Sequence, residues 1–240
     1  NFQLKKREFK TETGIYKGKR LTVQSTGIGP DNIDIVFNEL DALVNVDLNT
    51  REIKENHTAL NIVRIGTSGS LQADIPVDSW VMSKYAIGLD NMLRSYLIEE
   101  HSVAELEDAF IAQTNWDLRK GRPTVVPCAE TLENKIYSDK FHKGFTGTAG
   151  GFYGPQGRVV RLNIQDPQLN SKMDAFNYNG TRMTNLEMET SAIYGLGKLL
   201  GHNCLSLNAI IANRAVGEFS SNPEKTVNEL IAYTLDKLIG

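Results

Sequence analysis

One short segment, Arg64-Ile65-Gly66-Thr67-Ser68-Gly69, combines a cation with two hydroxyls and two glycines. The residues from Asn61 to Ile65 predict a buried strand, and the glycines predict a flexible turn after it, with free backbone donors. A planar Arg fork, hydroxyls and a closely approaching backbone together suit an oxyanion. The spacing alone leaves an ordinary strand-to-loop turn with a surface Arg as the alternative.

Two carboxylates, Glu187 and Glu189, stand one residue apart where a helix is predicted to begin. Helical spacing points them in different directions, so we do not expect them to form one general acid/base pair. A carboxylate at the mouth of an α/β sheet can instead accept two hydrogen bonds from vicinal ribose hydroxyls. The alternative is that acidic residues favour the first helical turn because of the helix dipole.

The segment from Gly151 to Arg158 places an aromatic ring, a side-chain amide and a guanidinium in one constrained loop. The Gln156 amide can donate and accept against the N3–H and carbonyl edge of a uracil, and Arg158 can stabilise the other carbonyl as negative charge grows on a leaving base. Phe152 offers a stacking surface. Glycines, Pro and Arg are equally typical of a solvated loop, which is the alternative.

The remaining candidate ligands of a metal ion are scattered. The histidines at 57, 101, 142 and 202 share no metal-ligand spacing, and Cys128 and Cys204 have no nearby partner. We therefore predict neither a metal site nor a disulfide, and no cofactor.

The elements that must position these residues alternate between strands and helices. Apolar residues at helical spacing predict helices over residues 33–43, 103–110, 189–200 and 223–238, with Gly201 ending the third and Asn222 capping the fourth. Short apolar runs predict strands at residues 21–25, 61–65, 80–87 and 204–212, and a glycine-rich strand and turn at 146–153. This alternation predicts an α/β fold, with a mixed sheet covered by helices on both faces.

Length and composition fit one globular domain over residues 1–240, of which 40% are apolar. The net charge of −3 comes from 26 basic and 29 acidic residues, so no overall field would attract nucleic acid or an anionic membrane. No apolar run is long enough to span a bilayer, and two distant cysteines suit a reducing compartment, so we expect a soluble, cytoplasmic protein.

Taken together, these motifs resemble the signature set of nucleoside phosphorylases, and of uridine phosphorylases in particular. The resemblance runs from about Arg7 to the C-terminus. Its segments, in chain order, are Arg7-Glu8-Phe9, Ser25-Thr26-Gly27-Ile28-Gly29, Arg64 to Gly69, Phe152 to Arg158, Glu187-Met188-Glu189 and Asn213-Arg214. It implies a single nucleoside phosphorylase-like domain whose central mixed sheet is partly barrel-like, and the cleavage of uridine by phosphate to uracil and ribose 1-phosphate.

The resemblance also assigns roles to individual residues. The implied phosphate ligands are Arg64, Thr67 and, from a neighbouring subunit, Arg7. The implied ribose contacts are Glu189, Met188 and Thr67. The implied base contacts are Gln156, Arg158, Phe152, Ser68, Gly69 and Ile211. The substrates would be uridine and phosphate, and the shared sites imply a homodimer or a hexamer built as a trimer of dimers, with a monovalent cation near Glu8.

Three other readings stay open at this stage: a purine nucleoside phosphorylase, a hydrolytic nucleosidase, and a relative that binds nucleosides without cleaving them. Purine-specific hexameric relatives carry an Asp after the late strand that protonates the purine, whereas this chain has Asn213 there, which cannot act as that acid at neutral pH. The family also has an early Gly-Asp-x-x-Arg phosphate loop that nothing here matches. We expect that loop to lie upstream of Asn1.

Overall fold

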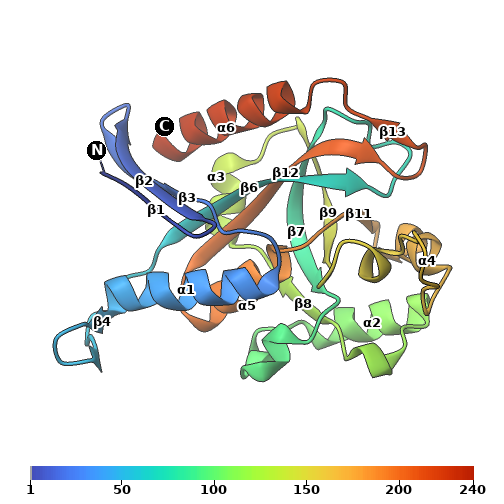
Figure 1. Cartoon of the computed structure of the whole chain (residues 1–240), viewed down its shortest axis with the longest axis horizontal. Helices are drawn as coiled ribbons and strands as arrows, with labels where there is room; N and C mark the ends of the chain where they lie inside the picture. Colours follow the sequence, from blue (N-terminus) through green and yellow to red (C-terminus); the bar gives the residue numbers. More distant parts are fainter. Residues whose placement is uncertain (1) are drawn as a thin grey trace.

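The structure is a computed structural model that describes residues 2–240. A central mixed sheet crosses the molecule, with α6 on one side and α1 and α5 on the other (Figure 1). The α-helices within the described residues are α1 Pro30–Asn45, α2 Ala104–Thr114, α3 Glu130–Ile136, α4 Leu169–Ala175, α5 Thr190–Leu199 and α6 Pro223–Ile239. No helix among these residues is both long and apolar enough to cross a membrane. The predicted α/β fold with helices on both faces is confirmed.

Five strands of the large sheet pair in a closed ring, in the order β12, β6, β11, β9, β7 and back to β12. The pairs β12–β6, β11–β9 and β9–β7 are parallel, while β6–β11 and β7–β12 are antiparallel. These strands are β6 Asn61–Ser70, β7 Trp80–Gly88, β9 Phe141–Thr148, β11 Thr181–Glu187 and β12 Asn203–Asn213. The partly barrel-like sheet is thereby confirmed.

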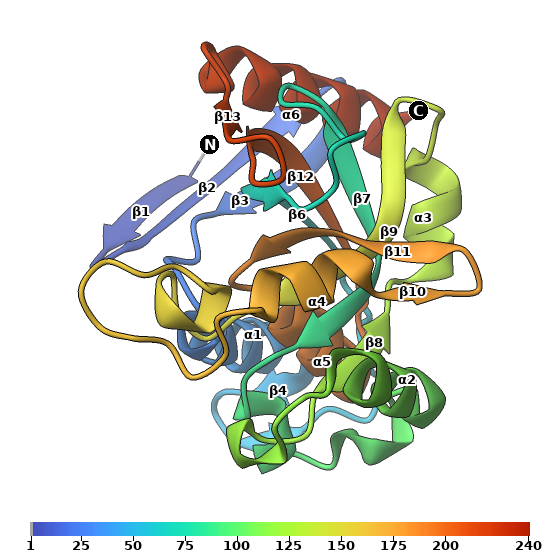
Figure 2. The same cartoon turned by 90° about the vertical axis from the view of Figure 1, so that its right-hand side faces the viewer.

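Shorter strands extend this ring and form two further sheets. The additions to the ring are β8 Thr124–Pro127, β10 Asn177–Tyr178 and β13 Glu218–Phe219. The other two sheets are a three-stranded N-terminal one, β1 Phe2–Lys6, β2 Phe9–Tyr16 and β3 Lys19–Gln24, and the hairpin β4 Val46–Asp47 with β5 Glu52–Ile53. In Figure 2, α4 and the β10–β11 hairpin lie on the face turned to the viewer.

Apolar side chains fill two main clusters on the two sides of the barrel strands. The larger cluster lies where α1, α3, α5 and α6 pack on the sheet, and the smaller lies where α2 and α4 pack on it. The predicted Asn222 cap is confirmed, since its side chain accepts a hydrogen bond from the Lys225 amide at the start of α6. These packed helices hold the strand ends on which the candidate site is built.

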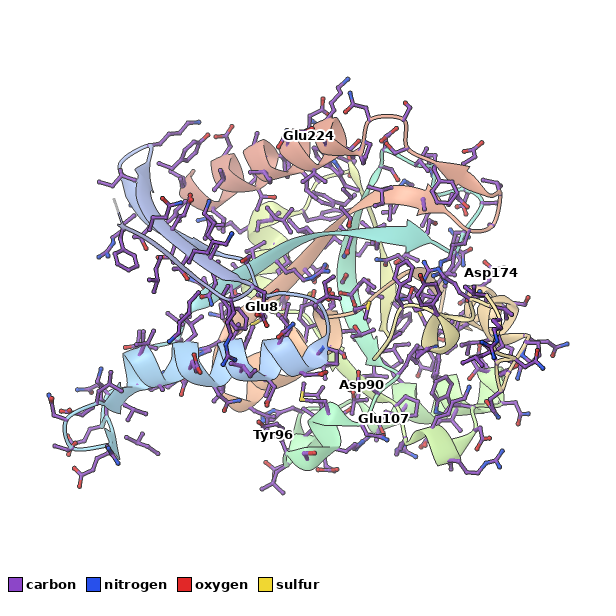
Figure 3. The ribbon with its side chains drawn as sticks, viewed as in Figure 1. Glu8, Asp90, Tyr96, Glu107, Asp174 and Glu224 are labelled. Atoms are coloured by element: carbon purple, nitrogen blue, oxygen red, sulfur yellow. The ribbon has the colours of Figure 1, made fainter. Side chains whose placement is uncertain are left out.

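A buried ion-pair network fastens α2 to the segment before β8, and Glu107 is its centre (Figure 3). The Glu107 side chain is 3% exposed and accepts from Arg94 Nη2 at 2.7 Å and from Arg122 Nε at 2.5 Å. We expect Glu107→Ala to lower the free energy of unfolding by about 3 kcal/mol, because Arg94 and Arg122 lose their buried partner and keep only the exposed carboxylates of Glu99 and Asp108. Urea unfolding would measure the loss.

Glu99 provides the matched control, because its carboxylate binds the same Arg94 but is 65% exposed. Glu99→Ala should change the free energy of unfolding by less than about 1 kcal/mol. Equal losses in the two variants would show that burial does not set the strength of this network.

Candidate functional site

Arg64 lies on β6 with its guanidinium beside the neighbouring strand β12. Its Nη1 donates to Asn208 Oδ1 at 3.0 Å and lies 3.4 Å from Ser206 Oγ. Gly66 makes this possible, because a Cβ at that position would lie only 2.2 Å from the same Nη1. The glycine therefore lets the cation lie close over the strand, in a fixed place.

The turn predicted after Ile65 is wrong: residues 66–70 continue β6. The reason is non-local, since β12 pairs with β6 in parallel as far as Asn213 and Ser70 and uses the backbone groups that a turn would have left free. Strand alternation then separates the two hydroxyls. Thr67 is exposed, whereas Ser68 is buried and accepts from the Asn185 side chain at 2.8 Å. Thr67 is thus the exposed hydroxyl of the two, and its role as a phosphate ligand stays a prediction.

The two carboxylates were predicted to point apart, and the structure corrects this: both converge on Arg64. Arg64 Nη2 lies 2.6 Å from Glu189 Oε2 and 3.2 Å from Glu187 Oε2. Glu187 is the last residue of β11, and α5 begins only at Thr190, so helical spacing does not apply between them. A cation and two carboxylates therefore share one nearly buried site.

Glu187 has a positioning role that the sequence did not reveal. Its carboxylate accepts from Thr148 Oγ1 at 2.6 Å and from the amides of Glu189 and Thr190 at 2.9 Å each. Burial raises the pKa of Glu187, and the charge of Arg64 opposes that rise. Glu187 thereby joins the ends of β9 and β11 to the start of α5 and holds Arg64 between them.

The second oxygen of Glu189 reaches the loop that precedes α1. Glu189 Oε1 accepts from the Gly29 amide at 2.8 Å, and Gly29 has a φ of 98° that favours glycine. The same loop is tied to the β1–β2 turn, because Ser25 Oγ donates to the Glu8 carbonyl at 2.9 Å (Figure 3). Arg7 is exposed in that turn. That Arg7 binds phosphate in the site of a neighbouring subunit stays a prediction.

Gln156 is the centre of the second part of the site. It is buried on a 3₁₀ helix, Gly154–Gln156, and its Oε1 accepts from Arg158 Nη1 at 2.7 Å and from Arg214 Nη2 at 2.8 Å. Two cations thus fix the side-chain oxygen as an acceptor. Among residues 2–240 no group accepts from the Nε2 group of Gln156, so it can donate to a ligand.

Arg158 also stacks on Phe152, its guanidinium carbon lying 3.9 Å from the ring centroid. The Phe152 ring is 52% exposed. The structure therefore brings three predicted base contacts together: Phe152, Gln156 and Arg158. Met188 and Ile211 are each partly exposed, and their roles stay predictions.

Arg214 is the site residue that the sequence reasoning passed over, although the Asn213-Arg214 pair was part of the resemblance. It follows β12 and lies over Gly69, where a Cβ would come within 3.3 Å of Arg214 Nε. Burial lowers the pKa of Arg214 to about 10, and the charge of Arg158 adds to this effect. Gly69, predicted as a base contact, thus makes room for Arg214, which bonds Gln156 from the end of β12.

β6 carries both parts of the site. Arg64 and Gly69 are five residues apart, which corresponds to roughly 16 Å along a strand. The Arg64 guanidinium lies against Gly66 and the Arg214 side chain against Gly69, so the two cations contact β6 at different points.

A cavity of about 750 Å³ lies beside Arg158, between the 153–166 loop and the segment that follows α2, which contributes Trp116 and Lys120. Trp116, Leu169 and Leu89 give it apolar walls, and Lys120 and Arg161 add positive charge. This volume is within the range of small-molecule sites. Arg158 separates the cavity from Gln156.

Asp90 follows β7 and lies beside Gly150, at the start of the loop with the predicted base contacts, residues 151–158 (Figure 3). A Cβ added to Gly150 would lie 3.3 Å from the Cβ of Asp90. Its Oδ1 accepts from the Met92 amide at 2.9 Å, but its buried Oδ2 has no hydrogen-bond partner among residues 2–240. Burial raises the pKa of Asp90, and the charge of Asp31 adds to the rise. A carboxylate here should therefore destabilise the native state at neutral pH.

We expect Asp90→Asn to raise the free energy of unfolding at pH 7 by about 1 kcal/mol, because a neutral amide is less costly to bury than a carboxylate. The raised pKa means that the folded state binds more protons, so the stability contribution of Asp90 is present at acid pH and is lost as pH rises. The gain from Asn should therefore shrink between pH 7 and pH 5 in urea titrations. A loss at both values would reveal a partner for the carboxylate.

The comparison with known proteins decides the family. A model of the phosphorylase superfamily matches residues 1–239. The chain belongs to this superfamily. The resemblance inferred from the motifs is thereby confirmed.

Both pyrimidine and purine enzymes are among the superfamily relatives. A uridine phosphorylase of Thermococcus kodakarensis is 29% identical over 241 residues, covering 98% of this chain and 72% of the relative. A DeoD-type purine nucleoside phosphorylase of Bacillus thuringiensis is 28% identical over 230 residues, covering 95% of this chain and 79% of the relative. A solved Trypanosoma brucei nucleoside phosphorylase with uridine phosphorylase activity has a TM-score of 0.87 and 27% identity, covering 100% of this chain and 86% of its own.

Proposed function

We propose that this protein is a pentosyltransferase that cleaves uridine with inorganic phosphate, giving uracil and ribose 1-phosphate. The observation that carries the proposal is the surrounding of Gln156: Arg158 of the same loop and Arg214 at the end of β12 hold its oxygen, and no group among residues 2–240 accepts from its Nε2. An amide donor flanked by two guanidinium groups suits the carbonyl-rich edge of uracil. The uridine phosphorylase relatives support the same substrate.

In this proposal, phosphate binds at Arg64 and the exposed Thr67, and Arg7 of a neighbouring subunit completes the site. Arg64 Nη2 lies 2.6 Å from Glu189 Oε2, so a bound phosphate displaces this carboxylate oxygen from Arg64. The exchange frees Glu189 to accept from the ribose hydroxyls, with Met188 against the sugar. A homodimer or larger assembly in the cytoplasm is part of the proposal, because Arg7 must come from a second copy.

The chemical step needs no covalent intermediate with the enzyme. A phosphate oxygen forms a bond to the anomeric carbon while the bond from that carbon to uracil N1 breaks, and its electron pair leaves with the base. Arg158 and the Gln156 amide stabilise the charge that grows on the uracil carbonyls. Arg64 and Glu189 hold phosphate and sugar in line, which supplies the orientation. A proton from solvent then neutralises the uracil anion.

Asn213 favours uridine over purine nucleosides. Its side-chain nitrogen donates to the carbonyls of Gln72 at 3.0 Å and Ile75 at 2.8 Å. Its side-chain oxygen accepts from the amides of Ala215 at 2.9 Å and Val216 at 3.2 Å. A buried amide whose donors and acceptor are all hydrogen-bonded cannot protonate a purine. This chain therefore lacks the general acid that purine-specific relatives have at this position.

Identification of the products tests the proposal. Uridine and phosphate are incubated with the protein and followed by ³¹P and ¹H NMR. Formation of ribose 1-phosphate in step with uracil supports phosphorolysis. Free ribose in its place would indicate a nucleosidase, and saturable uridine binding without any product would indicate a relative that only binds nucleosides.

A further inference from the structure

A second cluster of chemically active side chains lies away from the nucleoside site. Asp41 of α1, His57 of the segment before β6 and His202 of the turn between α5 and β12 come together although His57 and His202 are far apart in the chain. Sequence spacing predicted no metal site. That argument fails here because the fold, not the spacing, assembles the three groups.

The distances suit a small tetrahedral site. One nitrogen of each imidazole and one Asp41 oxygen all lie within 4.8 Å of one another, and His202 Nε2 lies 3.3 Å from Asp41 Oδ1. With metal–ligand bonds near 2.0–2.1 Å, the edge of a tetrahedron around Zn²⁺ is about 3.4 Å. The His202–Asp41 edge already has that length, and the His57 nitrogen lies within 4.8 Å of both other ligand atoms.

Neighbouring groups orient two of the three ligands. Asp41 Oδ1 accepts from Asn45 Nδ2 at 2.6 Å, and the Asn45 oxygen accepts from the Thr58 amide at 2.7 Å. His57 Nε2 lies 2.9 Å from the Leu200 carbonyl, which can only accept, so the proton sits on Nε2 and Nδ1 keeps its lone pair. Outer partners of this kind fix the ring and the free nitrogen of a metal-binding His.

His202 is the least expected member, because it is buried and incompletely bonded. It is 5% exposed, and its Nε2 has no hydrogen-bond partner within residues 2–240. Its Nδ1 lies 3.3 Å from the Leu60 amide, a long contact. Coordination through Nε2 moves the ring proton to Nδ1, so this contact must open on binding, which weakens the site but does not block it.

We propose that Asp41, His57 and His202 bind a divalent first-row transition ion such as Zn²⁺, with water as the fourth ligand. Two imidazoles and one carboxylate favour such ions over Mg²⁺, which prefers oxygen ligands. The ligands join α1 to the amino ends of β6 and β12, whereas Gly69 and Arg214 lie at the other ends of these strands. The bound ion therefore ties α1 to the two strands and should stabilise the fold.

Co²⁺ and Zn²⁺ are the probes, used on the full, untagged chain after treatment with a chelator. Co²⁺ should give the intense visible absorption of a four-coordinate site at one ion per chain, and Zn²⁺ should displace it and raise the thermal midpoint, whereas Mg²⁺ should do neither. Affinity should fall at least about tenfold in His57→Gln and in Asp41→Asn. His142→Gln, a histidine outside the cluster, should bind as the natural chain does.

Two results would overturn the proposal. One is a six-coordinate Co²⁺ spectrum or no Co²⁺ absorption at all. The other is a Zn²⁺ stabilisation of the same size in His57→Gln, Asp41→Asn and His142→Gln. Because His57 is exposed and Asn keeps the Asp41 hydrogen bond to Asn45, both ligand variants should fold, and circular dichroism before metal addition checks that they do.

Discussion

Replacing Arg64 with Met is expected to lower kcat/KM for uridine phosphorolysis by a factor of about 10³ or more. The guanidinium is the fixed cation between β6 and β12, and it holds Glu187 and Glu189 at 3.2 and 2.6 Å. Without it, phosphate loses its main charge partner and two carboxylates face each other in a nearly dry site. Initial rates at varied phosphate concentration would measure the loss.

The same substitution should lower the free energy of unfolding by about 3 kcal/mol, because it leaves buried carboxylates without their counter-ion. Adding Glu187→Gln to Arg64→Met should recover part of the stability but none of the activity. Arg64→Lys should lie between the natural chain and the Met variant in activity, since a lysine keeps the charge but not the planar fork. An unchanged phosphate KM in Arg64→Met would contradict the assignment.

Arg158→Ala is expected to reduce kcat/KM for uridine by about two orders of magnitude, which corresponds to roughly 3 kcal/mol of transition-state stabilisation. The loss has two sources. In the proposed function Arg158 stabilises the leaving base, and its Nη1 also donates to the Gln156 oxygen at 2.7 Å, so the amide loses its orientation without it. Steady-state kinetics with uridine and with a purine nucleoside would separate base recognition from a general defect.

Arg161→Ala is the matched control, because Arg161 is an exposed cation three residues further along the same loop. Its removal should change kcat/KM for uridine less than threefold, on the order of a surface substitution. Equal losses for uridine and the purine nucleoside in Arg158→Ala would contradict the role of Arg158 in reading the base.

Elements specified by local pattern were predictable from the sequence. The apolar spacing in residues 33–43 indicated α1, and Gly201 and Asn222 marked the end of α5 and the start of α6. Each of these signals comes from side chains within a few turns of one another, or from a cap beside the helix that it ends. The strand from Cys204 to Ala212 was found for the same reason and is one residue longer at each end.

Features that depend on a distant partner were not predictable. Gly66 and Gly69 indicate a turn by local preference, but hydrogen bonding to β12 keeps both residues in strand β6. Glu187 and Glu189 converge because β11 ends at Glu187 and α5 begins only after Glu189, and because Arg64, on another strand, attracts both. Tertiary pairing overrides local preference at both places.

The candidate site was predictable in its residue types but not in its connections. The motifs named Gln156 and Arg158, yet the bond from Arg214 to the Gln156 oxygen joins residues 58 positions apart. The proximity of His57 and His202 could not be predicted from the sequence either, since each lies in a loop with no metal-ligand motif. Of these two connections, only that of Arg214 had a signal in the sequence, because the family resemblance included the Asn213-Arg214 pair.

The central claim is that this chain uses phosphate to cleave uridine in preference to purine nucleosides. The most direct test follows the ultraviolet absorbance of uridine, and in parallel of inosine, with the protein in the presence and absence of millimolar phosphate. We predict loss of uridine only when phosphate is present, with inosine cleaved far more slowly. Preference for inosine, or cleavage of uridine at the same rate without phosphate, would contradict the account.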